Sequence, residues 1–182
     1  EINANPKLGS ASKVWLNYSL EYLKKQLNGN LIILKGNPRE CLDELVDFFD
    51  VHEISWNRCY EPWIIKRDKK LKIYLSEKIK VNSFNGSLLW EPWEILKNDG
   101  TPYKVFTPFY KRGCLTVSKP RVPKSEKIYF FNHNFRITDV SDLGLLKNKK
   151  WENQILSQWK VGEDSSIEIK KSFFLNGVQN YS

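Results

Sequence analysis

The sequence lacks the local signatures of several large enzyme classes. It contains no glycine-rich phosphate loop, no GxGxxG dinucleotide fingerprint, no HExxH zinc motif and no GxSxG nucleophile elbow. Histidine is scarce as well: His52 opens a predicted strand, where a structural role is expected, and His133 lies in a polar loop. The motifs therefore give no support to P-loop, metalloprotease or serine-hydrolase chemistry.

Methionine is absent and cysteine is rare. Cys41, Cys59 and Cys114 form an odd set without a CxxC spacing, which argues against both a disulfide framework and a zinc site. A reducing compartment suits such a chain, so a cytoplasmic location is expected. No apolar stretch approaches the ~20 residues of a membrane span, and we therefore expect no membrane partner.

The residues that are present describe a globular, basic chain. Its 182 residues suffice for one domain or for parts of two, and 41% of them are apolar. The aromatic residues, 7 Trp, 8 Tyr and 10 Phe, are expected mainly in the core. The net charge of +8 is compatible with a polyanionic partner without identifying one.

Hydrophobic periodicity predicts an α/β fold. A helix starting at Ser10 is expected to bury Leu16, Leu20, Leu23 and Leu27 and to stop at Asn28-Gly29. Short apolar runs predict strands over 31–35, 52–56 and 80–84, and amphipathic patterns predict helices over 38–49 and 62–79 between them. This alternation indicates a parallel sheet with right-handed crossovers.

The composition changes twice towards the carboxyl end. From Val117 the chain becomes rich in Pro, Lys and Arg without periodicity, which indicates a linker over 117–149. Helical spacing returns at Trp151, Ile155, Leu156 and Trp159. We therefore expect an α/β region over 1–116 and a helical region over 150–182.

Three segments carry a family resemblance. They are Asn57-Arg58-Cys59-Tyr60-Glu61-Pro62, Phe84 to Trp93, and Pro102 to Lys111 with its Phe-Thr-Pro-Phe-Tyr-Lys run. In this order and spacing they resemble the N-terminal α/β antenna domain of the DNA photolyase/cryptochrome family, closely over 8–116. The resemblance implies an incomplete doubly wound, Rossmann-like sheet over 1–116 that lacks its first strands. It also implies an interdomain linker over 117–149 and, over 150–182, the start of an all-α FAD-binding domain.

The resemblance also implies site residues. Asn57 and Arg58 follow a strand, and Asp99, Thr101 and Tyr103 lie in a polar loop. These turns would border an antenna cleft for a reduced folate or a deazaflavin, although the Glu found in many folate-binding members has no counterpart in register. From the residues alone, the first turn also reads as a structural one in which Asn57 caps a helix and Arg58 and Glu61 make ion pairs.

Two further positions complete the implied sites. Tyr181 lies where the family has a Tyr that contacts the FAD pyrophosphate. Lys111 and Arg112 could face DNA, while a solvated basic segment is the alternative. Most of the flavin pocket would follow Ser182, so we expect the chain alone to be inactive.

The resemblance implies a monomeric, FAD-dependent deoxyribodipyrimidine photo-lyase, a carbon–carbon lyase that repairs DNA containing UV photodimers in light. A cryptochrome photoreceptor without repair activity is the alternative. A small α/β nucleotide-binding module is a third possibility, and the missing phosphate loop speaks against it.

Overall fold

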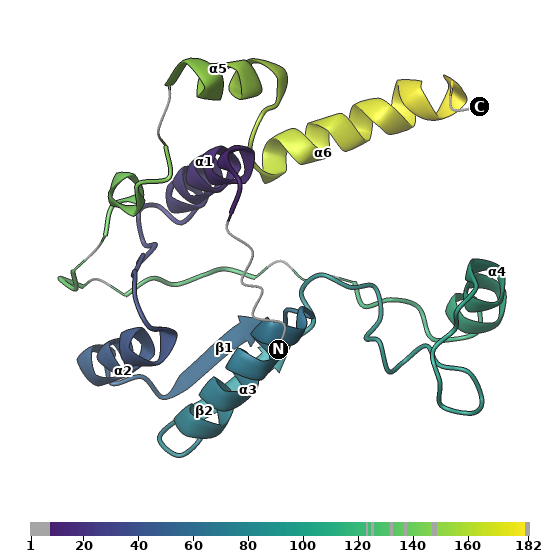
Figure 1. The fold of residues 1–182 in the computed structure, drawn as a ribbon, viewed down its shortest axis with the longest axis horizontal. Helices are drawn as coiled ribbons and strands as arrows, with labels where there is room; N and C mark the ends of the chain where they lie inside the picture. The colour runs from purple at the N-terminus through teal and green to yellow at the C-terminus, as the bar shows by residue number, and fades with distance from the viewer. Residues whose placement is uncertain are drawn as a thin grey trace. The chain divides into compact units, whose positions relative to one another are not determined.

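The protein has a mixed α/β fold with a parallel sheet, which confirms the predicted fold class (Figure 1). The computed structural model describes residues 8–122, 124, 126–131, 133–136, 138–146 and 149–180. Its elements are α1 (Ser10–Gln26), α2 (Pro38–Phe49), β1 (Glu53–Asn57), α3 (Pro62–Leu75), β2 (Lys80–Phe84), α4 (Phe106–Pro108), η1 (Phe109–Cys114), η2 (Val140–Leu143), α5 (Lys149–Gln158), α6 (Glu163–Ser172), η3 (Phe173–Gly177) and η4 (Val178–Asn180). Of these, η1 and η3 are π-helices, while η2 and η4 are 3₁₀-helices.

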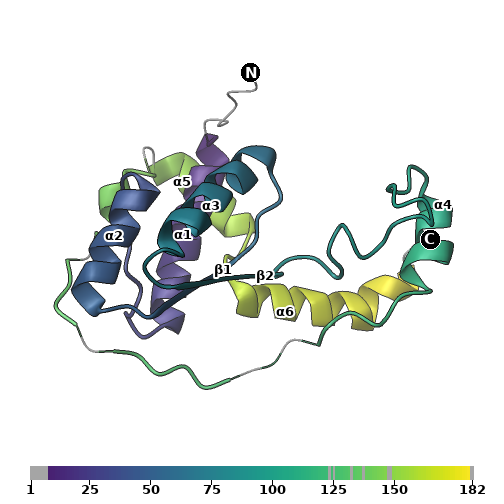
Figure 2. The same cartoon turned by 90° about the horizontal axis from the view of Figure 1, so that it is seen from below.

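The two strands pair in parallel, with Glu53 opposite Lys80 and Asn57 opposite Phe84. At the amino ends, the Lys80 ammonium pairs with the Glu53 carboxylate at 2.9 Å. Helix α3 joins the strands, and Figure 2 shows it running beside them. Both carboxyl ends therefore meet at one edge, where open α/β sheets place ligands.

Local chemistry explains where the helices of this region begin and end. Asn37 accepts a hydrogen bond from the Arg39 amide at 3.0 Å, so it caps α2, and Pro38 occupies the first turn, where a missing N–H costs nothing. Pro62 opens α3 in the same way. The fully buried Leu75 closes α3 against the core. These starts agree with the prediction, and α3 ends four residues before the predicted 79.

The predicted strand over 31–35 is wrong. Among the described residues only β1 and β2 form a sheet, and residues 30–35 have no regular secondary structure. The Ile33 carbonyl accepts a hydrogen bond from the Thr138 amide at 3.2 Å. An apolar run becomes a strand only when another strand satisfies its backbone groups. Here the segment at Thr138, which is not a strand, contacts the run instead.

Helix α1 is confirmed, but the predicted buried face is wrong. Its buried residues are Val14 and Asn17, whereas Leu16 and Leu23 are exposed. The contact with α5 does not bury the leucine stripe, because Leu16 lines an open pocket together with Ile155 of α5 and with Trp159. The stop at Asn28-Gly29 is confirmed, since both residues have positive φ angles, 51° and 83°.

The chain divides into two compact units. One comprises Glu1–Leu45 and Phe130–Ser182, and the other comprises Val46–Tyr129. In the first unit, the Tyr22 ring packs against Gly162, where φ is 113°, and its hydroxyl accepts a hydrogen bond from the Asp164 amide at 3.2 Å. This contact fixes the start of α6 beside α1. The domain boundaries expected at 116 and 149 remain predictions.

Candidate functional site

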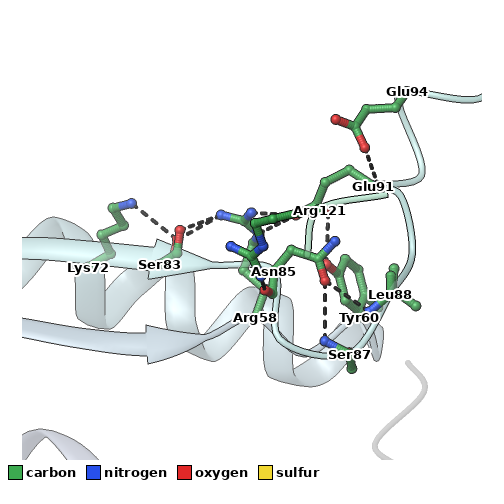
Figure 3. A network of polar contacts seen from close by, with 10 residues as sticks. All are labelled: Arg58, Tyr60, Lys72, Ser83, Asn85, Ser87, Leu88, Glu91, Glu94 and Arg121. Atoms are coloured by element: carbon green, nitrogen blue, oxygen red, sulfur yellow. Dashed lines mark hydrogen bonds and ion pairs between the residues drawn. The ribbon is translucent and has the colours of Figure 1, made fainter. Parts of the chain in front are cut away.

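The candidate site is built at the carboxyl edge of β1 and β2. The Arg58 amide donates to the Phe84 carbonyl at 2.8 Å and thus extends the strand pairing by one residue. The Arg58 guanidinium donates to the Ser83 carbonyl and to the Glu91 carboxylate (Figure 3). Its bond from Nε to Glu91 Oε1 measures 3.0 Å. Arg58 therefore ties both strands to the loop that follows β2.

Glu91 is the acceptor on which this network depends. Its side chain is only 8% exposed, and its second oxygen accepts a hydrogen bond from the Tyr60 hydroxyl at 2.8 Å. The hydrogen bond to Glu91 is the main cause that raises the pKa of Arg58 above its usual value. The pKa of Tyr60 is raised chiefly by desolvation and further by its bond to Glu91. Glu91 thus stays paired with a cation and a phenol.

The turn after β2 is held by polar contacts on both sides. Asn85 Oδ1 accepts hydrogen bonds from the amides of Ser87, at 3.2 Å, and Leu88, at 2.9 Å, which is an Asx turn. Arg121 donates to the Asn85 carbonyl, and Figure 3 shows the two side by side. The Trp90 indole N–H donates to the Ser118 carbonyl at 2.8 Å. The basic segment around 118–121 therefore lies along this turn.

Asn57 lies against the same turn, because a Cβ atom built on Gly86 would collide with the Asn57 amide group. A side chain at 86 would therefore force the Asn57 amide group to move. The alternative interpretation expected Asn57 to cap a helix, whereas the residue in the N-cap position of α3 is Glu61. The partner of Arg58, however, is Glu91, 33 residues along the chain, whereas the sequence suggested Glu61.

The polar loop that contains Asp99 is held by contacts among its own residues. Asp99 Oδ1 accepts hydrogen bonds from the Thr101 amide at 2.9 Å and from the Thr101 hydroxyl at 2.6 Å, while Lys97 lies 3.2 Å from Oδ2. The hydrogen bonds from Thr101 are the main cause that lowers the pKa of Asp99 to about 2. The carboxylate of this exposed turn is therefore ionised at neutral pH.

Tyr103 packs against Phe109, one of the residues that line an apolar pocket. Tyr103 and Ile95 both pack closely on the buried Gly113, and the Tyr103 ring meets Phe109 edge to face with centroids 6.3 Å apart. Ile95 and Phe109 line a pocket of about 610 Å³. Its other lining residues are Ser87, Leu88, Leu89, Trp90, Glu91, Pro92, Tyr110, Cys114 and Leu115. This volume suits a small organic ligand.

The predicted cleft residues therefore form three separate local arrangements. Asn57 and Arg58 lie against the turn after β2, and Asp99 and Thr101 form their own turn. Tyr103 packs behind the pocket, on Phe109. The sequence did not reveal Glu91 or Tyr60 as network members. The Trp-Glu-Pro run around Glu91 was visible, but its partner lies too far away in sequence to be read from spacing.

The other predicted site residues can be placed in part. Lys111 and Arg112 lie on η1 with exposed side chains. Tyr181, predicted to contact FAD, lies outside the described residues. Within the described part of the chain, no group of three His, Cys, Asp or Glu residues could hold a metal ion. No helix of that part is long and apolar enough to cross a membrane.

The parallel strands and the helices around them define an α/β domain, and comparison with known proteins assigns its family. The family model described as DNA photolyase matches residues 2–126, so the chain belongs to the DNA photolyase family. A deoxyribodipyrimidine photo-lyase of Agrobacterium fabrum is 30% identical over 199 residues, covering 100% of this chain. Cryptochrome-2 of Arabidopsis thaliana is 34% identical over 193 residues, covering 96%.

A solved structure supports the assignment. The crystal structure of a bacterial class III photolyase from Agrobacterium tumefaciens matches 94% of this chain with a TM-score of 0.83 and 29% sequence identity. The match covers 36% of that photolyase, and the chain spans 39% of the Agrobacterium fabrum photo-lyase and 30% of cryptochrome-2. The family resemblance of the sequence is thereby confirmed.

The contact between Asn57 and Gly86 yields a prediction. Gly86→Ala should destabilise the protein by about 1–3 kcal/mol, because the new methyl group overlaps the Asn57 side chain. Urea unfolding followed by tryptophan fluorescence measures this cost. The double variant Gly86→Ala/Asn57→Ala should recover much of the loss, since the overlapping amide is gone. A Gly86→Ala protein as stable as the parent would contradict the close approach.

Proposed function

We propose that this chain is the antenna-domain part of an FAD-dependent photolyase that reverses pyrimidine photodimers in DNA under light. The observation that supports it best is the match of the whole chain to an enzyme named deoxyribodipyrimidine photo-lyase, together with the fold of a class III photolyase. FAD, when bound, supplies the electron that splits the dimer. In this proposal the chain contributes the antenna site, a basic surface and one contact to FAD.

The contact to FAD is assigned to Tyr181, on the resemblance alone. A phenol hydroxyl donates well to a phosphate oxygen, and such a bond to a charged acceptor contributes on the order of 1.5–3 kcal/mol. Lys111 and Arg112 are proposed to face the DNA backbone, since their exposed cations suit phosphate. We also propose that the protein is a cytoplasmic monomer and that the α/β domain, linker and helical domain divide at 116 and 149.

For the antenna chromophore we propose the apolar pocket beside the loop of Asp99 to Tyr103. The pocket fits a planar ring system in size and lining, because Trp90, Phe109 and Tyr110 offer aromatic surface. Tyr103 joins the loop to the pocket wall through Gly113. The turn of Asn57 and Arg58 would then act indirectly, by holding the segment that contains Glu91. The ligand is a reduced folate or a deazaflavin.

A cryptochrome photoreceptor is the second candidate, favoured by the 34% identity to cryptochrome-2. The two candidates differ in one measurable property, which is repair of the lesion. A photoreceptor of this family would bind flavin and respond to light without restoring intact bases.

Photorepair tests the main proposal. The full-length protein, purified in the dark with its flavin, should convert dimer-containing oligonucleotides to intact ones under near-ultraviolet light. The 182-residue chain alone should give no repair above a control without protein. Flavin-loaded full-length protein that restores no bases would contradict the repair function and favour the photoreceptor.

Substitutions test the antenna pocket. In the full-length protein, Leu89→Trp and Thr101→Trp should lower the absorbance of the second chromophore and leave the flavin content unchanged, because the bulk fills the pocket or its bordering loop. Val122→Trp, at an exposed position of the same unit, is the matched control and should change neither. An unchanged antenna band in Leu89→Trp, or parallel loss of flavin, would show that the pocket is misassigned.

A further inference from the structure

The segment 115–121 connects the two walls of the apolar pocket. Leu115 directly follows η1 and lines the pocket from that wall. Three residues later, the Ser118 carbonyl accepts a hydrogen bond from the Trp90 indole N–H at 2.8 Å, and Trp90 lines the pocket from the other wall. The chain therefore leaves one wall at Leu115 and is fastened to the opposite wall at Trp90.

Arg121 makes a second attachment to the same wall. Its guanidinium donates a hydrogen bond to the Asn85 carbonyl, as Figure 3 shows. The side chain of Asn85 in turn accepts hydrogen bonds from the amides of Ser87 and Leu88, and both of these residues line the pocket. Arg121 thus lies outside the pocket lining and holds the turn from which one wall begins.

The attachments of this segment are few and exposed. Ser118 and Arg121 are both exposed, and within the described part of the chain residues 117–121 make no backbone–backbone hydrogen bond. A segment with few buried contacts and few backbone hydrogen bonds opens locally at a low cost in free energy. Its fastened and open positions are therefore close in free energy, and a ligand that favours one of them shifts the balance.

Trp90 is the side chain through which a ligand can shift this balance. Its half-buried ring lines the pocket, while its N–H holds the segment at Ser118. Leu89 and Leu115 line the pocket from opposite walls and are 69% and 62% exposed, so both walls keep apolar surface that a ligand would cover. A planar ligand seated against Trp90 would restrict the indole and so favour the bond to Ser118.

We propose that Arg121 is a positioning residue for the antenna chromophore, and that residues 115–121 form a strap which Arg121 and Trp90 fasten when the pocket is occupied. The inference rests on the proposed antenna function of the pocket and adds the element that retains the ligand. Coupling of this kind is reciprocal: the fastened strap tightens ligand binding by the same factor by which the ligand stabilises the fastened strap.

Two measurements on the full-length protein test the strap. Titration of antenna-free protein with methenyltetrahydrofolate, and separately with a deazaflavin, gives the dissociation constants. Hydrogen exchange read by mass spectrometry reports the opening of residues 117–121 with and without the ligand that binds. In the parent, saturating ligand should slow this exchange about fivefold.

Arg121→Gln removes the attachment to Asn85. It should weaken binding of the same ligand about fivefold and abolish most of the slowing, with flavin content unchanged, because the two factors are equal by reciprocity. Trp90→Phe keeps an aromatic ring on the wall but lacks the N–H, so the ligand should not slow exchange at 117–121 in this variant. A merely structural role of Arg121 would weaken binding without ligand-dependent protection of the strap in the parent.

Lys119→Gln is the matched control. It removes a positive charge two residues from Arg121, and Lys119 makes no hydrogen bond or ion pair within the described part of the chain. Both the dissociation constant and the ligand-dependent slowing should stay at the parent values. The control thereby separates the contact to Asn85 from the loss of one charge.

Three results would overturn the strap. The first is equal slowing by the ligand in the parent and in Arg121→Gln, and the second is equal weakening of binding by Arg121→Gln and Lys119→Gln. The third is an antenna band that is lost in Leu89→Trp while Arg121→Gln binds at full affinity, which contradicts the strap alone. An unchanged antenna band in Leu89→Trp contradicts the pocket and the strap together, so the two failures are distinguishable.

Discussion

The pairing of Arg58 with Glu91 joins the carboxyl edge of the two strands to the loop that builds the candidate site. A carboxylate as buried as that of Glu91 is costly unless it is paired and hydrogen-bonded, and here Arg58 and Tyr60 supply both. Arg58 also donates a hydrogen bond to the Ser83 carbonyl at the end of β2, and this bond orients its guanidinium group. Sheet edge and loop are therefore fixed by one interaction.

The other features of this unit follow from that interaction. With Glu91 held, the segment 87–92 forms one wall of the apolar pocket, and Phe109 and its neighbours form the other. The Arg121 and Trp90 contacts then lay the basic segment along the turn after β2. The turn of Asn57 and Arg58 is thus tied, through Glu91, to one wall of this pocket.

The sequence predicted the elements whose signals are local. The strand predicted over 52–56 is present over 53–57, and the strand over 80–84, the Pro-initiated helices and the stop at Asn28-Gly29 are present as predicted. All of these signals depend on neighbours in the chain. Two expectations failed because they depend on distant partners. The run 31–35 forms no strand because the Thr138 segment, rather than a strand, meets it. Leu16 of α1 stays exposed because it lines a pocket that is left open beside Ile155 and Trp159.

The same difference between local signals and distant partners applies to the candidate site. Asn57 and Arg58 lie at the sheet edge, where the strand prediction placed them. The partner of Arg58 escaped prediction because 33 residues separate it from Glu91 and no periodicity links them. Membership in the DNA photolyase family was readable because three segments agree at once, whereas the roles of single residues require the three-dimensional neighbours.

A double-mutant cycle between Arg58 and Glu91 tests the central claim most directly. Urea unfolding of the parent, Arg58→Met, Glu91→Leu and the double variant gives the coupling free energy between the two side chains. Because charged hydrogen bonds of this kind contribute about 1.5–3 kcal/mol, we expect a coupling of about 2 kcal/mol, with the double variant more stable than the sum of the single losses. Additive losses would show that the pair does not fix the edge.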